Sequence, residues 1–136
     1  MDAKELLSTY YGRLAEHRYA EAAAMFRDDG DVLWSIPGEG PLAGRHESKA
    51  AIEKALQTFA DGRIGEVKRP IHAYCVADDG EHVCVQYLLH LQREGKTCGI
   101  VAIDAWHIHD GALAEVWTFF ETLYEFDAWT RADRQP

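Results

Sequence analysis

Two long segments that interleave polar and apolar residues, 81–93 and 96–109, flank the dipeptide Glu94-Gly95. A two-residue connection of this kind is typical of a β-hairpin, and its length fixes which residues face one another. Arg93 then lies opposite Lys96, and the pairing continues along both strands. Because successive side chains of a strand point to opposite faces, this one register assigns every residue of the hairpin to a face.

One face of the predicted hairpin is apolar or aromatic except for a single carboxylate. Its facing pairs are Leu91 with Cys98, Leu89 with Ile100, Tyr87 with Ala102, Val85 with Asp104, and Val83 with Trp106. Asp104 therefore points toward the expected core. A buried carboxylate must be paired, hydrogen-bonded or protonated, because its charge is costly in a low dielectric. Asp104 is thus either a structural hydrogen-bond partner or a functional acid.

The opposite face of the hairpin is mixed and carries Leu88, Val101 and Ile103. The predicted helices can cover one face of the sheet, and the apolar face is the one they need to cover. An apolar patch left exposed on a small protein marks an interface. We therefore predict a homodimer formed through the sheet face that carries these three residues.

The remaining elements complete an α+β pattern in one domain, residues 1–136. Apolar periodicity predicts helices at 3–17, 18–26 and 49–59, a short strand at 32–36 and a Gly- and Pro-rich loop at 37–44. Further strands are expected at 65–77 and 112–124. The sequence thus predicts three N-terminal helices packed on a curved, mostly antiparallel sheet.

The register of the last strand stays open between two connections. A two-residue Asp110-Gly111 turn would direct Trp117 and Phe119 into the pocket between sheet and helices. A three-residue loop that starts at His109 would instead direct Val116, Thr118 and Phe120 there.

Charge and motif content exclude several classes of function. The formal charge of −9 disfavours nucleic acid and anionic membranes as partners. The N-terminus predicts no signal peptide or transmembrane span, and Cys75, Cys84 and Cys98 lack a CxxC spacing, so we expect a cytoplasmic protein with reduced thiols. Dinucleotide and phosphate-loop motifs are missing from the sequence, and we expect no metal and no cofactor.

The order of several short motifs resembles the SnoaL-like branch of the NTF2-like superfamily, which includes relatives of ketosteroid isomerase. The motifs that carry the resemblance are Phe26-x-Asp28-Asp29, Val32-Leu33-Trp34, Pro37-Gly38, Pro41-Leu42-Ala43-Gly44, Ala51-Ile52, Ile103-Asp104-x-Trp106 and Asp110-Gly111-x-Leu113-x-Glu115. The resemblance implies a cone-like, cystatin-like fold around a deep apolar cavity. It also favours the three-residue last hairpin.

The resemblance further implies site residues. The tyrosine that donates a hydrogen bond to the oxyanion in ketosteroid isomerases matches Tyr10, and the protonated aspartate matches Asp104, whereas the general base falls on Trp34. Tyr10 and Asp104 are therefore the candidate catalytic residues. The expected binding residues line the pocket: Trp34, Trp106, Val85, Tyr87, Leu89, Thr118 and Phe120.

Two functions of different classes follow. The first is an enzyme, polyketide cyclase-like or isomerase-like, that stabilises an enolate of a small apolar carbonyl compound. Asp104 would act there as a neutral donor or, if ionised, as the base. The second is a non-catalytic module that binds a small ligand or serves a structural role, and Trp34 at the expected base position favours it.

Overall fold

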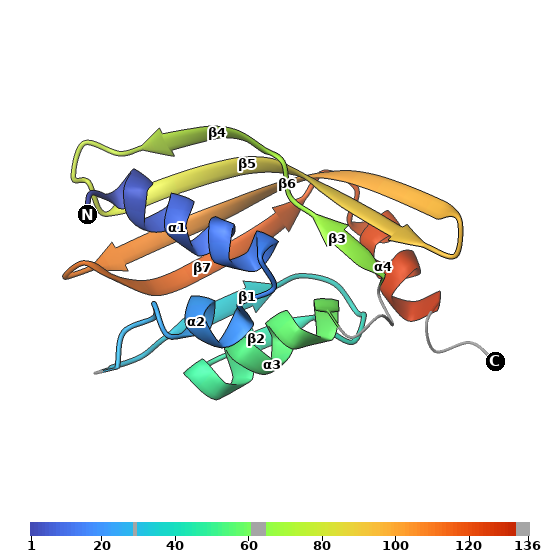
Figure 1. Ribbon diagram of the computed structural model, residues 1–136, viewed down its shortest axis with the longest axis horizontal. Coiled ribbons are helices and arrows are strands. Elements are labelled where there is room, and N and C mark those ends of the chain that lie inside the picture. The colour runs from blue at the N-terminus through green and yellow to red at the C-terminus, as the bar shows by residue number, and fades with distance from the viewer. Residues whose placement is uncertain (29, 61–64, 133–136) are drawn as a thin grey trace.

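A computed structural model describes residues 1–28, 30–60 and 65–132, so Asp29 of the first motif lies outside the described residues. Helices α1 (Ala3–Ala15), α2 (Tyr19–Ala23) and α3 (Lys49–Ala60) pack against one curved sheet (Figure 1). The sheet comprises β1 (Leu33–Ile36), β2 (Gly44–His46), β3 (Glu66–Lys68), β4 (Ile71–Val76), β5 (His82–Arg93), β6 (Lys96–His109) and β7 (Ala112–Phe120). A further helix, α4 (Leu123–Ala132), follows the last strand.

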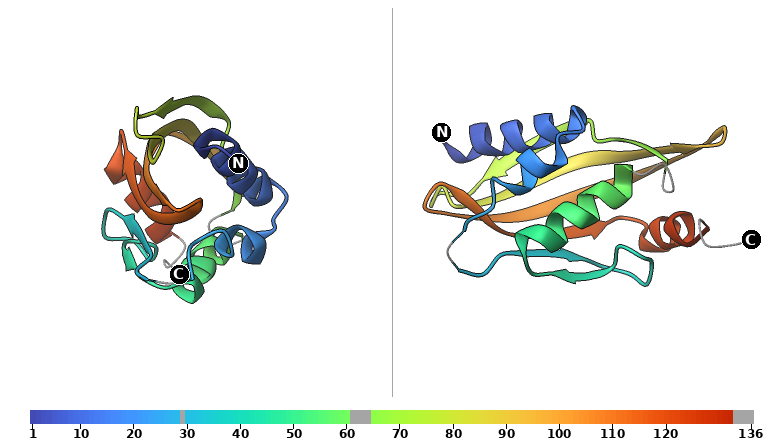
Figure 2. Two further views of the ribbon diagram at one scale, coloured as in Figure 1. Left: turned by 90° about the vertical axis from the view of Figure 1, so that its left-hand side faces the viewer. Right: turned by 60° about the horizontal axis from the view of Figure 1, so that its bottom comes forward.

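The strands follow the order β2-β1-β7-β6-β5-β3, and β4 also pairs with β5. β1 and β7 run parallel, whereas the other pairs are antiparallel. The sheet curls into a cone, and the helices close its open side (Figure 2). The predicted α+β fold, with three N-terminal helices on a curved and mostly antiparallel sheet, is confirmed.

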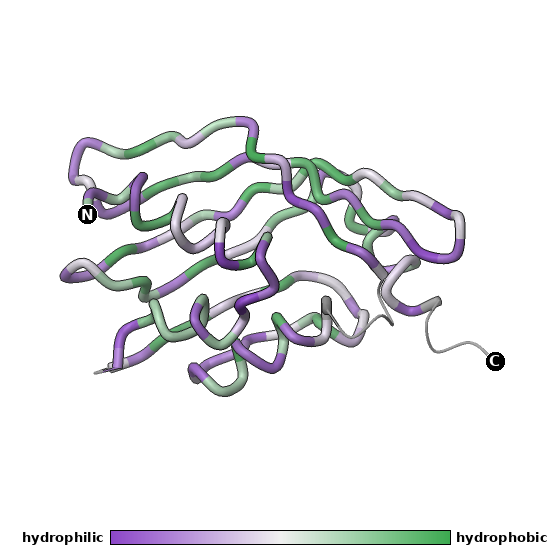
Figure 3. The backbone as a smooth tube through the Cα atoms, viewed as in Figure 1, coloured by the Kyte–Doolittle hydropathy of each residue, from purple (hydrophilic) through white to green (hydrophobic). Residues whose placement is uncertain are grey.

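The central hairpin has the register that its turn predicts. Arg93 lies opposite Lys96, and Val85 lies opposite Asp104. Glu94 and Gly95 both have positive φ, at 51° and 80°, as a tight two-residue hairpin turn requires. Polar and apolar residues are interleaved along these strands (Figure 3), and the inward-facing set is buried. The concave face of the sheet therefore carries Asp104, which is 6% exposed.

The last hairpin combines features of both alternatives. Its turn is the two-residue Asp110-Gly111, with His109 opposite Ala112. A bulge next to His107 then shifts the register by one residue, so that Asp104 faces Thr118. A bulge adds one residue to one strand and thereby reverses which side chains point inward beyond it. Thr118 consequently faces the pocket, as the resemblance implied, although the expected three-residue loop was wrong.

Several predicted boundaries were also wrong, each because of a specific backbone pairing. The second helix ends at Ala23, since the backbone of Met25 and Arg27 hydrogen-bonds to Leu113 at the start of β7. The expected long strand 65–77 divides into β3 and β4 around Pro70, which has no N–H to donate to a sheet. Within the expected loop 37–44, Gly44 begins β2 and pairs with β1.

The C-terminal helix α4 was not predicted: the expected strand 112–124 overlaps its first two residues, and β7 ends earlier, at Phe120. α4 closes one end of the cone: Phe126 stacks on Phe120 of β7 with ring centroids 4.1 Å apart. Asp127 accepts hydrogen bonds from the backbone N–H groups of Glu39, at 3.0 Å, and Gly40, at 3.3 Å. Across the described residues, no helix has the length and apolar character needed to cross a membrane.

Close packing of the 38–40 loop on α4 gives a stability prediction. Gly38 has φ 105°, and a Cβ built there would lie 2.2 Å from Oδ1 of Asp127. We expect Gly38→Ala to lower the free energy of unfolding by about 1–3 kcal/mol, since backbone strain adds to the loss of the Asp127 hydrogen bonds. Urea denaturation measures the change.

Gly12→Ala in α1 is the matched control, because a Cβ at Gly12 meets no atom within 4 Å. It should raise the free energy of unfolding by roughly 0.5–1 kcal/mol through helix propensity. Equal stabilities for the Gly38→Ala variant and the parent protein would contradict the packing described for α4.

Candidate functional site

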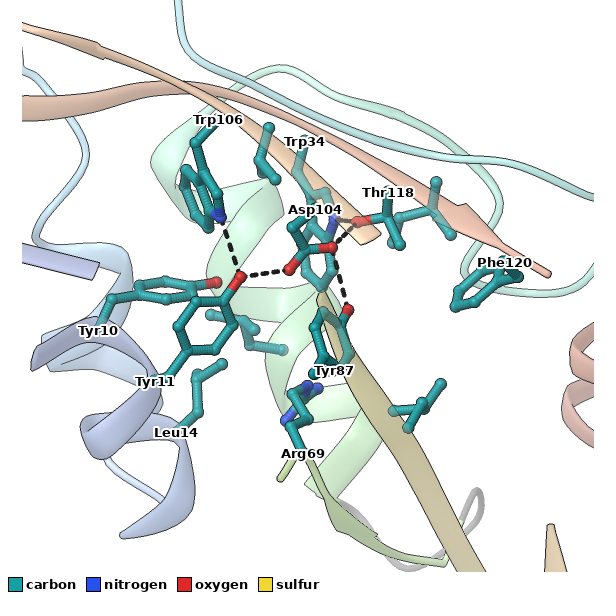
Figure 4. Close-up of a pocket in the computed structure, with 14 residues that line it drawn as sticks. Tyr10, Tyr11, Leu14, Trp34, Arg69, Tyr87, Asp104, Trp106, Thr118 and Phe120 are labelled. Atoms are coloured by element: carbon teal, nitrogen blue, oxygen red, sulfur yellow. Dashed lines mark hydrogen bonds between the residues drawn. The ribbon is translucent and has the colours of Figure 1, made fainter. Parts of the chain in front are cut away.

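A pocket lies between α1, α3 and the concave face of the sheet (Figure 4). Its empty volume is about 410 Å³, including the part that opens to solvent. Fourteen residues line it: Tyr10, Tyr11, Leu14, Trp34, Ile36, Leu56, Arg69, Tyr87, Leu89, Asp104, Trp106, Val116, Thr118 and Phe120. The pocket is thus mostly apolar and aromatic, with one acid and one cation among these residues, as small-molecule sites commonly are.

The structure places the residues expected at the site in this pocket, with the exception of Val85. Val85 is fully buried opposite Asp104 but is not one of the lining residues. Strand alternation fixes the face on which a side chain lies and leaves its depth undetermined. The expected placement of Val85 in the pocket wall was therefore wrong.

Asp104 accepts hydrogen bonds from three neutral hydroxyl groups (Figure 4). The hydroxyl of Tyr11 donates to Oδ2 at 2.6 Å, and those of Thr118 and Tyr87 donate to Oδ1 at 2.7 Å and 3.0 Å. The three donors come from α1, β7 and β5, so the carboxyl group joins the helix layer to the sheet. Because each carboxylate oxygen has two lone pairs, Oδ1 is saturated and Oδ2 keeps one acceptor position.

Two indole groups determine the direction in which these hydroxyl protons point. Nε1 of Trp106 donates to the Tyr11 hydroxyl, and Nε1 of Trp34 donates to the Thr118 hydroxyl, both at 2.9 Å. An indole N–H can only donate, so each hydroxyl oxygen accepts from it and turns its own proton toward Asp104. Trp34 and Trp106 therefore have a polar role besides lining the pocket.

The tyrosine that donates to Asp104 is Tyr11, which directly follows the Tyr10 that the resemblance matches to the oxyanion donor. Successive helical residues differ by about 100° around the axis, and both rings reach the pocket from α1. Tyr10 packs edge-on against Trp106, with ring centroids 5.0 Å apart. Within the described part of the chain no hydrogen bond of the Tyr10 hydroxyl is found, and the role of Tyr10 as a donor to an oxyanion stays a prediction.

Burial raises the pKa of Asp104 above the ordinary aspartate value. The hydrogen bonds from Tyr11, Thr118 and Tyr87 and the positive charge of Arg69 oppose that increase. The pKa values of the three pocket tyrosines are raised as well, chiefly by burial and by the nearby Asp104, so their hydroxyls stay protonated. The pocket thus combines a weakly acidic carboxyl group with neutral donors.

Tyr11 and Arg69 are pocket residues that the sequence reasoning missed. Tyr11 directly follows Tyr10 in the apolar stripe of α1, and the helical period alone did not decide between the two rings. Arg69 lies in the break between β3 and β4, and its neighbour Pro70 was the available signal for that break. Nowhere in the described ranges do three or more His, Cys, Asp or Glu side chains form a group that could hold a metal ion.

Comparison with protein families matches residues 7–116 to the SnoaL-like domain. The chain belongs to the SnoaL-like family. No curated protein matches this SnoaL-like chain.

Solved structures share the fold of this SnoaL-like protein at low sequence identity. Bal32a, from a soil-derived mobile gene cassette, is 20% identical with a TM-score of 0.85, and the match covers 94% of this chain and 95% of Bal32a. SalBIII is an epoxide hydrolase/cyclase-like enzyme with a role in pyran ring formation in the polyether salinomycin. It is 18% identical with a TM-score of 0.73, and the match covers 88% of this chain and 90% of SalBIII. A putative polyketide cyclase from Xanthomonas campestris pv. campestris is 18% identical with a TM-score of 0.74, covering 94% and 96%.

The hydrogen-bond network predicts how the acidity of Asp104 responds to mutation. Tyr11→Phe removes one donor that favours the charged carboxylate, so the pKa of Asp104 should rise further above its ordinary value. Carboxyl ¹³C NMR over a pH titration measures this pKa. Tyr74→Phe is the control, because Tyr74 lies on β4 and is not among the residues that line the pocket. A pKa that is unchanged or lowered by Tyr11→Phe would contradict the assigned hydrogen bond.

Proposed function

We propose that this SnoaL-like protein is an enzyme that forms an enolate from a small, largely apolar carbonyl compound, as in cyclase or isomerase chemistry. The observation that carries the proposal is the buried Asp104, held by three hydroxyl groups at the side of an aromatic pocket. SalBIII and the putative polyketide cyclase, which share the fold, support the cyclase class. The assignment of roles rests on the site itself.

Asp104 is the proton acceptor in this proposal. It is the one carboxylate among the fourteen lining residues, and histidine does not occur among them. The ionised form accepts all three donated protons, and its remaining position on Oδ2 can receive the proton of the substrate carbon. Since burial raises its pKa, Asp104 is a stronger base than an exposed aspartate. This role replaces the neutral donor that the ketosteroid isomerase comparison implied.

Tyr10 is the donor to the substrate oxygen in the same proposal. Its ring lines the pocket beside Tyr11, with centroids 5.2 Å apart, and burial raises its pKa so that the phenol keeps its proton. A buried donor aimed at an oxygen that becomes negative stabilises the transition state. Tyr11 and Thr118 position the base, and Trp34 orients Thr118. Because Asp104 is the base in this proposal, catalysis does not require a carboxylate at Trp34, the position that matches the general base of ketosteroid isomerases.

Hydrogen exchange at carbon tests the function without a known substrate. In D₂O the protein should accelerate α-proton exchange of small aryl ketones and 1,3-diketones above the buffer rate, which ¹H NMR follows. Asp104→Asn should abolish the acceleration, and Tyr10→Phe should reduce it by roughly 100- to 1000-fold, the usual cost of removing an oxyanion donor.

The matched control is Asp78→Asn, which changes an exposed acid in a loop and should leave the rate unchanged. Circular dichroism establishes that each variant is folded. If a folded Asp104→Asn variant exchanged as fast as the parent protein, the assignment of Asp104 as the base would be wrong.

A non-catalytic ligand-binding module is the second candidate, and Trp34 at the family's base position favours it. Native mass spectrometry of the protein with the same ketones discriminates the two. Recovery of a bound ligand together with buffer-level exchange would support the binding module. Bound ligand with exchange above the buffer rate would support the enzyme.

The protein is also proposed to form a homodimer through the convex face of the sheet, which includes the mixed face of the hairpin. Four large apolar side chains of β5, β6 and β7 are exposed there: Leu88 by 39%, Ile103 by 40%, Trp117 by 39% and Phe119 by 54%. Val101 lies opposite Leu88 and two residues before Ile103 on this face, and it is half-buried. A contiguous patch of this kind favours association.

Ile103→Lys should convert the dimer to a monomer in analytical ultracentrifugation, because it places a charge at the centre of the patch. Val76→Lys is the control, since Val76 is 46% exposed on β4, away from the patch. A monomeric parent protein at micromolar concentration would rule out this interface.

A further inference from the structure

Arg69 is the one cation among the fourteen residues that line the pocket. It lies between the end of β3 at Lys68 and the start of β4 at Ile71, where Pro70 interrupts the edge of the sheet. This break brings a half-buried arginine side chain to the pocket beside Tyr87 (Figure 4). In an uninterrupted strand, residues 69 and 70 would pair with the neighbouring strand and would leave no gap at this edge of the sheet.

A second hollow adjoins the pocket and shares lining residues with it. It is lined by Tyr11, Leu14, Ala15, His17, Glu66, Val67, Lys68, Arg69 and Pro70. Tyr11, Leu14 and Arg69 line both hollows, so they form the boundary between the inner pocket and this outer groove. A ligand longer than the inner pocket would pass Arg69 at this boundary.

The charges at the boundary differ from those of the whole chain. The protein has a formal net charge of −9, yet two cations, Lys68 and Arg69, line the outer groove with one acid, Glu66, which pairs with Lys68 at 3.7 Å. The field of Arg69 also reaches the inner site, where it lowers the pKa values of Asp104 and Tyr87 against the larger effect of burial. A positive charge beside an apolar pocket selects for ligands that carry an anion at one end.

We propose that the substrate is an amphipathic carboxylic acid, whose apolar carbonyl part occupies the inner pocket while Arg69 binds its carboxylate at the boundary with the outer groove. This inference rests on the proposed function for the role of the carbonyl part. The planar guanidinium matches a carboxylate with two parallel hydrogen bonds, so Arg69 is suited to fix the position of the ligand along the pocket. Fixing one end of the substrate places its other end at Asp104 and Tyr10.

Binding of the carboxylate would also act on the base. The positive charge of Arg69 stabilises ionised Asp104, and an anion bound to the guanidinium cancels part of that effect. Asp104 therefore becomes a stronger base when the acid end of the substrate is in place. An otherwise identical neutral compound lacks both the anchor and this activation.

Two matched probes test the proposal: 3-benzoylpropionate, an aryl ketone with a carboxylate, and its neutral primary amide. Trp34 and Trp106 line the pocket, so intrinsic fluorescence reports binding of either probe. We expect the parent protein to bind the acid about tenfold more tightly than the amide, since hydrogen bonds to charged groups are the stronger ones. Arg69→Gln should remove this preference, and Arg69→Lys should retain part of it.

Lys68→Gln is the matched control, because it removes the adjacent positive charge from a residue that lines the outer groove and not the inner pocket. It should keep the preference for the acid. Equal binding of acid and amide by the parent protein, or an unchanged preference in Arg69→Gln, overturns the proposal. Affinity for the acid that falls equally in Lys68→Gln and Arg69→Gln also overturns it, since that indicates a diffuse charge effect.

Deuterium exchange at the carbon next to the ketone separates this proposal from the enzymatic one. An acid preference that depends on Arg69, without exchange above the buffer rate, supports the ligand class and overturns the enolate chemistry. Asp104-dependent exchange of acid and amide at equal rates and equal affinities supports the chemistry and overturns the role of Arg69. Faster exchange of the acid, lost in Arg69→Gln, supports both.

Discussion

The hydrogen bonds to Asp104 are the constraint on which the rest of the site depends. A carboxyl group that is 6% exposed cannot rely on water, so the protein must supply its partners. Hydroxyl groups from α1, β5 and β7 do so, and indole N–H groups orient two of them. The same interactions hold the helix layer on the sheet and keep the pocket walls in place, so stability and the candidate chemistry share one network.

The network requires three strand registers and one helix rotation to be correct together. The Glu94-Gly95 turn sets Asp104 opposite Val85, and the bulge next to His107 sets Asp104 opposite Thr118. Parallel pairing of β1 with β7 then brings Trp34 opposite Val116, two residues from Thr118. A shift of one residue in any of these pairs would turn its donor to the far side of the sheet. The orientation of α1 selects Tyr11 in place of Tyr10.

Local chemistry explains which parts of this arrangement the sequence predicts. The central hairpin and the inward direction of Asp104 follow from a tight turn and a period of two, which are short-range signals. The bulge in the last hairpin, the break at Pro70 and the packing of α4 on the 38–40 loop depend on contacts between segments far apart in the chain. Periodicity could not decide between Tyr10 and Tyr11, and it gave no reason to place Arg69 at the pocket, because both depend on how whole elements sit against one another. The family resemblance correctly indicated the fold and the inward Thr118, but it gave no sign that Tyr11 is the tyrosine that donates to Asp104.

The ionisation state of Asp104 is the central claim of this account. Three hydroxyl donors, two of them fixed by tryptophan, satisfy a carboxylate, and a base in the pocket must be ionised before substrate binds. The infrared difference spectrum between the parent protein and Asp104→Asn at neutral pH reports this state directly. We predict that the substitution removes carboxylate stretching bands, so that these bands of Asp104 appear in the difference spectrum. Loss of the carbonyl band of a protonated carboxylic acid would contradict it and would make Asp104 a proton donor.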